Sequence, residues 1–337
     1  MRKKIYIAYT GGTIGMRPST RGYVPAPGFL SETLAEMPEF HRPEMPEFTM
    51  NEYTNLIDSS DMSPNDWQQM ADDIAEHYDD YDGFIILHGT DTMAYTASAL
   101  SFMLQGLGKP VIVTGSQIPL AELRSDGQEN LLNALYIAAN YPIPEVTLFF
   151  NNKLMRGNRS RKLDANGFDA FDSPNYPMLI DAGIDIKVTG QHREIPPNTQ
   201  MTVKDIQAQP IGLVSLYPGI SADVIKNTLL QPVKALILLS YGVGNAPQSS
   251  ELLDQLKRAR DSHVVVLNCT QCTRGKVDMH GYANGQTLLE VGVVSGADMT
   301  PEAALAKLHY LLSQSLSYDE IRAQLQADIS GELSIES

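Results

Sequence analysis

The chain has 337 residues, of which 43% are apolar and 19% charged, and its formal net charge is −15. This length exceeds the size at which one hydrophobic core usually stops growing, so we expect two domains. The acidic balance argues against a nucleic-acid partner, because phosphate contacts need clustered Lys and Arg. No stretch approaches the length of a membrane span, and the apolar run near the start is too short for a signal-peptide core. We therefore expect a cytoplasmic protein with no membrane partner.

The first predicted strand, Ile5 to Tyr9, runs into a turn that carries two glycines and then Thr13. In an open α/β sheet, ligands bind beyond the carboxyl ends of the strands, so this turn would bring the Thr13 hydroxyl into such a crevice. The Gly- and Pro-rich stretch 15–29 then predicts a loop, and its place beside Thr13 favours an active-site lid. Within it, Tyr23 either helps to activate Thr13 or only anchors the loop.

The next predicted elements are a short helix over Phe29 to Met37 and a strand over Thr49 to Ile57. That strand ends at Asp58-Ser59-Ser60, whose ordinary role is turn formation. Ser63-Pro64 then opens a helix through His77, with Ser63 as N-cap and Pro64 at the first helical position.

A buried strand over Phe84 to Leu87 is followed by His88, Gly89, Thr90 and Asp91, and a helix is predicted from Asp91 to Leu104. Thr and Asp are also common N-cap residues, so capping is the alternative interpretation of this turn. The strand Lys109 to Thr114 likewise leads into Gly115-Ser116. Three strand ends thus each carry a glycine beside a hydroxyl residue.

Asn130 to Asn140 predicts a helix and Val146 to Asn151 a strand, after which the sequence becomes basic. The ordinary interpretation of that basic run is a surface loop whose charges pair with nearby carboxylates. Its cationic residues are Lys153, Arg156, Arg159, Arg161 and Lys162.

Periodicity is lost from Ile184 to Gln209, so we place a linker at 191–210, between an N-terminal α/β catalytic domain at 1–190 and a C-terminal α/β domain at 211–337. The second domain is predicted to contain strands at 211–217, 233–240 and 264–267 and helices at 221–230, 250–259, 301–315 and 318–327. Alternation of strands and helices predicts an α/β fold of two doubly wound domains with parallel sheets, the first larger than the second.

The only cysteines are Cys269 and Cys272, and their spacing is also found in redox and metal sites. This pair directly follows an apolar run rather than opening a helix, and the chain has no second Cys pair to complete a zinc site. We expect two reduced thiols, and neither a metal nor a cofactor.

Six motifs occur in an order that resembles the bacterial-type L-asparaginases, most closely the cytoplasmic type I enzymes, over nearly the whole chain. They are TGGTIG near the start, DSSD at 58–61, HGTDTMAYTAS at 88–98, TGSQIP at 114–119, RGNRSRK at 156–162 and SYGVGNAP at 240–247. The resemblance implies hydrolysis of L-asparagine to L-aspartate and ammonia through a threonine nucleophile and a covalent acyl-enzyme.

The resemblance also implies roles for single residues. Thr13 would attack with the help of Tyr23, and Thr90 and Lys162 would form a second hydroxyl–base pair that Asp91 orients. A Lys amine acts as a base only when its pKa is lowered, which a nearby carboxylate opposes, so the sequence leaves this chemistry open. The residues expected to bind the substrate are Asp58, Ser59, Ser60, Thr90, Asp91, Ser116 and, from a neighbouring subunit of a homodimer or homotetramer, Asn245.

Some type I relatives have a regulatory asparagine site, for which this sequence offers four candidates, Arg161, Ser240, Thr270 and Cys272. Leu239 occupies a position where the resemblance leads us to expect Arg, which argues against allosteric activation.

Three other functions compete with this one. A nucleotide-binding dehydrogenase would need GxGxxG after the first strand, and GGTIG lacks that spacing. An amino-acid sensor would need Asp91 and Ser59, but not Thr13, Thr90 and Lys162 together. A glutaminase or amidotransferase subunit would share the chemistry. The preference for asparagine over glutamine depends on one methylene of pocket depth, which is worth only about 1–3 kcal/mol and cannot be predicted from the sequence.

Overall fold

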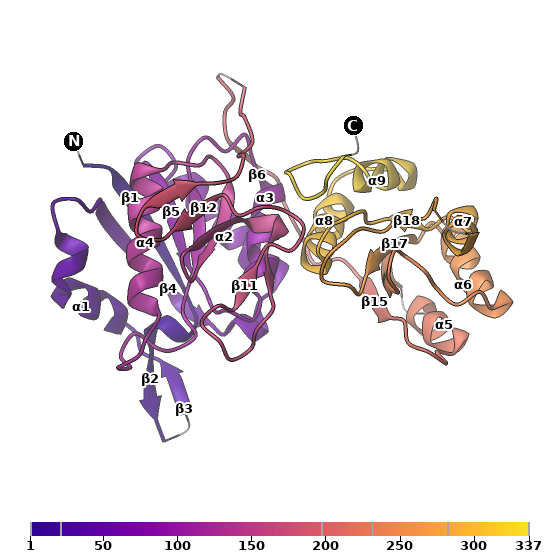
Figure 1. Ribbon diagram of the computed structural model, residues 1–337, viewed down its shortest axis with the longest axis horizontal. Helices are drawn as coiled ribbons and strands as arrows, with labels where there is room; N and C mark the ends of the chain where they lie inside the picture. Colours follow the sequence, from indigo (N-terminus) through magenta and orange to yellow (C-terminus); the bar gives the residue numbers. More distant parts are fainter. Residues whose placement is uncertain (1, 21, 197, 231, 282, 336–337) are drawn as a thin grey trace. The chain divides into compact units, whose positions relative to one another are not determined.

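The computed structural model describes residues 2–20, 22–196, 198–230, 232–281 and 283–335. The chain forms two compact units, 1–204 and 205–337. Each has a sheet of its own, and Figure 1 labels many of the elements of both.

The first unit is built on an eight-stranded sheet with the order β13-β12-β9-β8-β7-β5-β1-β4. Five neighbouring strands are parallel, which confirms the α/β class. They are β1 (Lys4–Gly11), β4 (Glu47–Ile57), β5 (Gly83–Leu87), β7 (Val111–Thr114) and β8 (Val146–Phe150).

The other edge of this sheet is antiparallel, so the prediction of a wholly parallel sheet is wrong there. Asn151 and Asn152 have φ of 45° and 65°, which suits a tight two-residue hairpin between β8 and β9. A short turn of this kind reverses the chain where a crossover helix would have kept it parallel. The antiparallel strands are β9 (Lys153–Arg156), β12 (Ile180–Ala182) and β13 (Ile186–Val188).

The basic run is not a surface loop throughout, because Arg156 and Arg159 are buried. Arg156 Nε donates to Glu145 at 2.6 Å, and both side chains of this pair are 6% exposed. The guanidinium of Arg156 also lies 4.3 Å from the ring centroid of Tyr176. The charges expected at the surface therefore help to fix β9 and the η4 turn (Gly157–Arg159) inside the fold.

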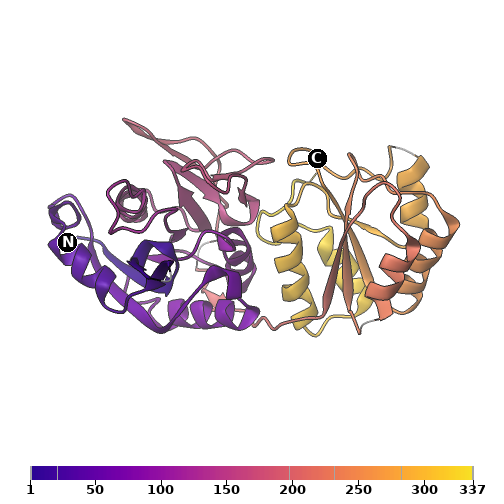
Figure 2. The ribbon, with the colours of Figure 1, turned by 90° about the horizontal axis from the view of Figure 1, so that it is seen from below.

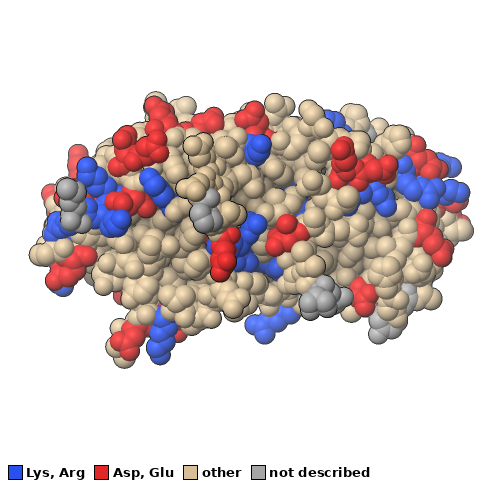
Figure 3. Space-filling model, turned by 90° about the horizontal axis from the view of Figure 1, so that it is seen from above, with Lys and Arg blue, Asp and Glu red and all other residues tan. Residues whose placement is uncertain are grey.

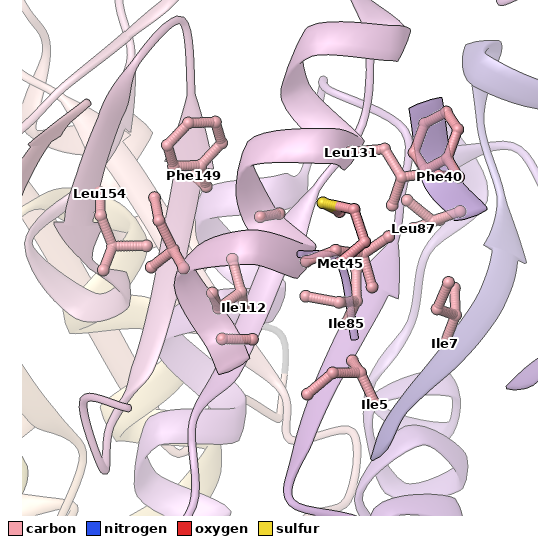
Figure 4. Close-up of a cluster of buried hydrophobic side chains, with 14 of the residues drawn as sticks. Ile5, Ile7, Phe40, Met45, Ile85, Leu87, Ile112, Leu131, Phe149 and Leu154 are labelled. Carbon is pink, nitrogen blue, oxygen red and sulfur yellow. The ribbon is translucent and has the colours of Figure 1, made fainter. Parts of the chain in front are cut away.

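Alternate residues of the central strands face opposite sides of the sheet, and both sides are buried. Figure 4 shows Ile5, Ile7, Ile85 and Leu87 on the side covered by Leu131 of α4. The helices of this unit are α1 (Phe29–Glu36), α2 (Pro64–Glu76), α3 (Met93–Met103) and α4 (Gly127–Asn140). The predicted start of α2 is confirmed: Ser63 precedes it as N-cap and donates to the Asp66 carboxylate.

The stretch expected to be a loop after Thr13 contains an antiparallel hairpin instead, which projects at the lower edge of Figure 1. Its strands are β2 (Met16–Ser19) and β3 (Gly22–Pro25). Cross-strand hydrogen bonding gives this stretch regular structure that its Gly and Pro content concealed. The part of the chain that lost periodicity also contains β13 and the short β14 (Thr202–Val203), which pairs with β6 (Leu104–Gln105).

The second unit has a wholly parallel sheet in the order β15-β16-β17-β18, as predicted for that domain. Figure 2 shows helices on both of its faces. The sequence analysis missed β18 and α7. The elements are β15 (Ile211–Ser215), α5 (Ala222–Leu230), β16 (Ala235–Ser240), α6 (Ser250–Asp261), β17 (Val265–Thr270), α7 (Ala283–Glu290), β18 (Val294–Ser295), α8 (Pro301–Ser313) and α9 (Tyr318–Leu325).

A fully buried ion pair ties the C-terminal segment to α8. Lys307 Nζ lies 2.5 Å from Glu332 Oε1 and donates to the carbonyls of Leu325 and Ala327, and the backbone N–H of Ser330 donates to Glu332. Burial would raise the pKa of Glu332, but the Lys307 charge and these hydrogen bonds hold it below its usual range. The sequence analysis did not predict this pair.

Acidic and basic side chains lie interspersed on the face of the molecule drawn in Figure 3. Within the described ranges, none of the helices combines the length and the apolar character that a membrane span requires.

Candidate active site

Thr13, the predicted nucleophile, begins the short η1 turn (Thr13–Gly15) directly after β1. Gly11 and Gly12 have φ of 133° and 89°, a backbone conformation that favours glycine. A Cβ on Gly12 would lie only 2.4 Å from the backbone nitrogen of Gly89, so this turn packs against the turn that follows β5. The Thr13 side chain is half-buried, and none of the described residues forms a hydrogen bond with its hydroxyl.

The turn after β4 also packs against the turn that follows β5. A Cβ on Gly89 would meet Ser59 Oγ at 2.5 Å, and Thr92 Oγ1 donates to the Ser59 carbonyl at 2.7 Å. Ser59 is buried, whereas Asp58 and Ser60 are exposed, and Asp58 Oδ1 accepts from the Ser60 backbone N–H and hydroxyl, both at 2.9 Å. Three strand ends of one sheet thus meet through close contacts that glycines permit.

His88, the first residue of the turn after β5, is part of the core. Its Nδ1 lies 2.6 Å from the carbonyl oxygen of Gly89, and because a carbonyl can only accept, Nδ1 carries the proton. Nε2 then accepts from Thr96 Oγ1, which in turn accepts from the Trp67 indole. Burial lowers the pKa of His88 to about 4, so the ring is neutral near neutral pH and holds the turn in place.

Thr90, Asp91 and Lys162 form the central cluster of the site. Lys162 Nζ donates to Thr90 Oγ1 at 2.8 Å and to Asp91 Oδ1 at 2.8 Å. The helix α3 begins only at Met93, with Thr92 in the N-cap position, so helix capping does not account for Thr90 and Asp91. The Lys162 side chain is 19% exposed and that of Asp91 is 66% exposed, which leaves the carboxylate open to a ligand.

Lys162 is brought to this cluster by the buried stretch that precedes it. After η4 the chain forms β10 (Arg161–Lys162), which pairs with β11 (Phe171–Asp172). The burial of Arg156 and Arg159 fixes the approach to β10, so a side chain 72 residues away from Thr90 reaches its hydroxyl.

Gln117 is a further member of this cluster that the sequence analysis did not single out. Thr90 Oγ1 donates to Gln117 Oε1 at 2.9 Å, and Gln117 Nε2 donates to the Gly167 carbonyl at 3.0 Å. The Asp126 carboxylate accepts from the backbone N–H of Gln117. The only signal in the sequence was the place of Gln117 in TGSQIP beside Ser116, which is buried and donates to the Ile118 carbonyl.

Tyr23 lies on β3, and among the described residues no hydrogen bond joins it to Thr13. The residue is 48% exposed. Desolvation and a hydrogen bond to Glu122 raise the pKa of the Tyr23 hydroxyl. The structure therefore shows Tyr23 paired with a carboxylate rather than with the threonine.

The remaining predicted residues of the second unit follow its strands. Asn245 lies in the turn after β16, and Ser240, the last residue of β16, donates to the Cys269 carbonyl at 3.3 Å. Thr270 Oγ1 donates to the Gly242 carbonyl and accepts from the Cys272 N–H. Arg161, the fourth residue proposed for regulation, belongs to the first unit and is half-buried.

Both cysteines are free thiols, as predicted, with Cys269 buried and Cys272 exposed. Burial raises the pKa of Cys269 to about 12, so this thiol is unreactive at neutral pH. Among the residues that the structure describes, no three His, Cys, Asp or Glu side chains lie close enough together to hold a metal ion.

Fold and site together define a two-unit α/β protein with a hydroxyl–lysine–carboxylate cluster beyond the carboxyl end of a parallel strand, an arrangement typical of hydrolases that use a side-chain nucleophile. Residues 4–194 match the family model for the asparaginase N-terminal domain, and residues 210–325 match that for the glutaminase/asparaginase C-terminal domain.

Comparison with single proteins gives the same result. The chain is 65% identical over 332 residues to L-asparaginase 1 of Escherichia coli K12, covering 98% of each chain. The crystal structure of L-asparaginase I from Vibrio cholerae is 65% identical, with a TM-score of 0.93 over 99% of this chain and 100% of that one. The thermostable L-asparaginase from Thermococcus kodakarensis is 32% identical, with a TM-score of 0.89 over 99% of this chain and 100% of that chain. The chain therefore belongs to the asparaginase family, and within it to type I.

Proposed function

We propose that this protein hydrolyses L-asparagine to L-aspartate and ammonia through an ester of Thr13. The observation that carries the proposal is the cluster in which one Lys162 amine contacts both the Thr90 hydroxyl and the Asp91 carboxylate at 2.8 Å. The Thr13 hydroxyl lies on the adjoining turn and is not used by any hydrogen bond to the described residues. A sensor that only binds an amino acid would not need this second hydroxyl–amine pair.

In the first half-reaction, Thr13 Oγ attacks the side-chain amide carbon of asparagine and its proton passes to a base. Tyr23 assists this step after it exchanges its hydrogen bond to Glu122 for one to Thr13. Backbone N–H groups of the glycine-containing turns stabilise the negative charge that develops on the carbonyl oxygen. The carbon–nitrogen bond then breaks as the base returns the Thr13 proton to the nitrogen, and ammonia leaves. A β-aspartyl ester remains on Thr13.

In the second half-reaction, water attacks the ester carbonyl, and L-aspartate is released with recovery of the Thr13 hydroxyl. Thr90 and Lys162 act here as a hydroxyl–amine pair that takes the proton of the attacking water. Lys162 donates to Thr90 in the structure, so a Thr90-to-Lys162 proton transfer requires a neutral amine and rotation of the Thr90 hydroxyl. Asp91 orients the amine through its own contact with Nζ.

The amino-acid end of the substrate would be held by charged and polar groups of the same turns. Asp91 would bind the ammonium group, and the 66% exposure of its side chain supports this role. Asp58, Ser59 and Ser60 hold the α-amino and α-carboxylate groups from the turn after β4, and Ser116 lies near the reacting amide. The family resemblance further assigns Asn245 to the active site of a neighbouring subunit. We therefore propose a homodimer at least, and a homotetramer as a dimer of dimers.

Two further expectations follow from the type I resemblance. We propose that the enzyme works in the cytoplasm. We also propose that it lacks allosteric activation by asparagine, because Leu239 stands where the resemblance leads us to expect Arg. In support, the Ser240 and Thr270 hydroxyls both donate to carbonyls of their own unit.

The direct test is ammonia release from purified protein with L-asparagine and, separately, with L-glutamine. We expect rapid release from asparagine. A protein that releases ammonia from neither amide, yet unfolds at a higher temperature when asparagine is added, would be a binding module and would contradict the proposal. Faster release from glutamine would keep the chemistry and change the substrate.

A further inference from the structure

The turn that carries Asn245 is closed by its own backbone. The Tyr241 N–H donates to the Asn245 carbonyl at 2.9 Å, and the Asn245 N–H donates to the Tyr241 carbonyl at 2.8 Å. Between them, Gly242 and Gly244 have φ of 50° and 108°. A turn with two such glycines has many conformations open to it, so a single geometry needs support from outside the turn.

That support comes from three bonds to three successive carbonyls. Thr270 Oγ1 donates to the Gly242 carbonyl at 2.6 Å, and Asn268 Nδ2 donates to the Gly244 carbonyl at 3.0 Å. The backbone N–H of Asp278 donates to the Val243 carbonyl at 2.9 Å. Asn268 and Thr270 are two residues apart on β17, so both side chains point to the same side of the strand.

Asn268 is the anchor nearest to Asn245, and its surroundings fit a donor role. It is fully buried, and a Cβ on Gly244 would lie 3.1 Å from its Nδ2 atom. Its side-chain oxygen has no hydrogen-bond partner within the described part of the chain. An amide that is kept in the core with an unsatisfied oxygen costs stability. The N–H that it donates to Gly244 is the gain that offsets this cost.

We propose that Asn268 is a positioning residue for Asn245, with Thr270 as the second anchor of the turn 241–245. This inference rests on the proposed function, in which Asn245 binds substrate. Asn268 Nδ2 also donates to Met279 Sδ at 3.5 Å, but its route to Asn245 is the backbone of Gly244, the residue next to Asn245. Because all three anchoring bonds lie within one unit, the turn needs no neighbouring subunit to hold its shape, and Asn245 would enter a neighbouring site already oriented.

A double-mutant cycle on KM for L-asparagine tests this coupling. We expect Asn245→Ala to raise KM by about tenfold to a hundredfold, because it removes a hydrogen bond to a charged substrate. Asn268→Leu should raise KM by roughly threefold to tenfold, with a smaller change in kcat. The double variant should match Asn245→Ala alone. Asn227→Leu, on the exposed face of α5, is the control and should leave KM unchanged.

Three further variants keep the test decisive where Asn268→Leu folds poorly. In Asn268→Asp, a protonated carboxyl can donate to the Gly244 carbonyl and an ionised one cannot. The ratio of its KM to that of the wild type, measured at each pH, should therefore fall towards one as the pH is lowered. Thr270→Val should raise KM, and Thr270→Ser, which keeps the donor to Gly242, should not.

The failures can be told apart. An unchanged KM in Asn245→Ala would overturn the assignment of Asn245 and the inference with it. A raised KM in Asn245→Ala, together with effects of Asn268→Leu that add to it in full, would leave the proposed function standing and reject the positioning role of Asn268.

Discussion

Both units place polar side chains at or near the carboxyl ends of parallel strands, but they use them differently. In the first unit, Lys162, Thr90 and Gln117 are bonded to one another through their side chains. In the second, Thr270 and Asn268 are bonded to backbone carbonyls of a turn. Hydrogen bonds between side chains bring together groups that can exchange protons. Hydrogen bonds from side chains to backbone carbonyls only fix the shape of a turn. A position at the carboxyl end of a strand therefore does not by itself predict chemistry.

The largest effect expected from this contrast is that of Thr13→Ala. Removing the nucleophile should lower kcat by at least about 10⁴-fold, while stability changes by less than about 0.5 kcal/mol because the hydroxyl has no partner among the described residues. Thr10→Val is the matched control, since the buried Thr10 hydroxyl donates to the Leu87 carbonyl at 2.8 Å. It should cost about 1 kcal/mol of stability and retain activity. Ammonia release and urea unfolding of both variants provide the comparison. A Thr13→Ala protein with more than a hundredth of the wild-type rate would contradict the account.

Lys162→Met should come next, with kcat lower by roughly 10²–10⁴-fold, the usual loss when a general base is removed. The variant keeps the aliphatic stem and loses the amine that contacts Thr90 and Asp91. Steady-state kinetics with asparagine measure the loss. Lys162→Arg retains the positive charge but not the compact amine, so it should remain strongly impaired. A fully active arginine variant would mean that the cluster supplies only charge.

The second unit should respond to Lys307→Met through stability and not through chemistry. Removing one partner of the fully buried pair leaves Glu332 uncompensated, which should cost about 3–5 kcal/mol. The double variant Lys307→Met/Glu332→Leu should recover most of this loss. The pKa of Glu332 is held below its ordinary value of 4.5 in the folded protein. The ionised carboxylate therefore stabilises the fold above pH 4.5, and this stabilisation is lost as the pH falls through the lower, folded-state pKa. Denaturant unfolding between pH 3 and 7 follows this, and kcat per folded molecule should stay unchanged. A Lys307→Met protein as stable as the wild type would show that the pair contributes nothing.

The smallest effect is expected in the shape of the rate curve. If the polar groups after β16 and β17 serve only to fix turns, the rate should rise hyperbolically with asparagine concentration. Equilibrium dialysis of the Thr13→Ala protein should then find one class of site per chain. A sigmoidal curve with a second asparagine site would contradict this and would point to Arg161, Ser240, Thr270 and Cys272.

Much of the core fold could be predicted because short apolar runs bounded by turn residues are typical of buried parallel strands. β1 and β5 were predicted in this way, and the side chains on both faces of these two strands are buried. The antiparallel edge could not be predicted, because its reversal depends on two left-handed residues, Asn151 and Asn152, and the apolar run of β8 has no direction of its own.

The candidate site was predicted in part for a different reason. The residues themselves pointed to three strand ends. The pairing of Thr90 with Lys162 came from the family resemblance, because no sequence pattern indicates a contact between two residues so distant along the chain. Gln117 could not be found because a glutamine after a turn has no distinctive pattern. The burial of Arg156 was missed because β8 and the hairpin turn separate it in sequence from its partner, Glu145.

The central claim is that Thr13 becomes covalently attached to the substrate. The most direct measurement is mass spectrometry of the wild-type protein quenched in acid during turnover of L-asparagine, followed by peptide mapping. The account predicts one added aspartyl group on the peptide that contains Thr13, and none in Thr13→Ala. An aspartyl group on the peptide that contains Thr90, or ammonia release with no added group on any peptide of the quenched protein, would contradict it.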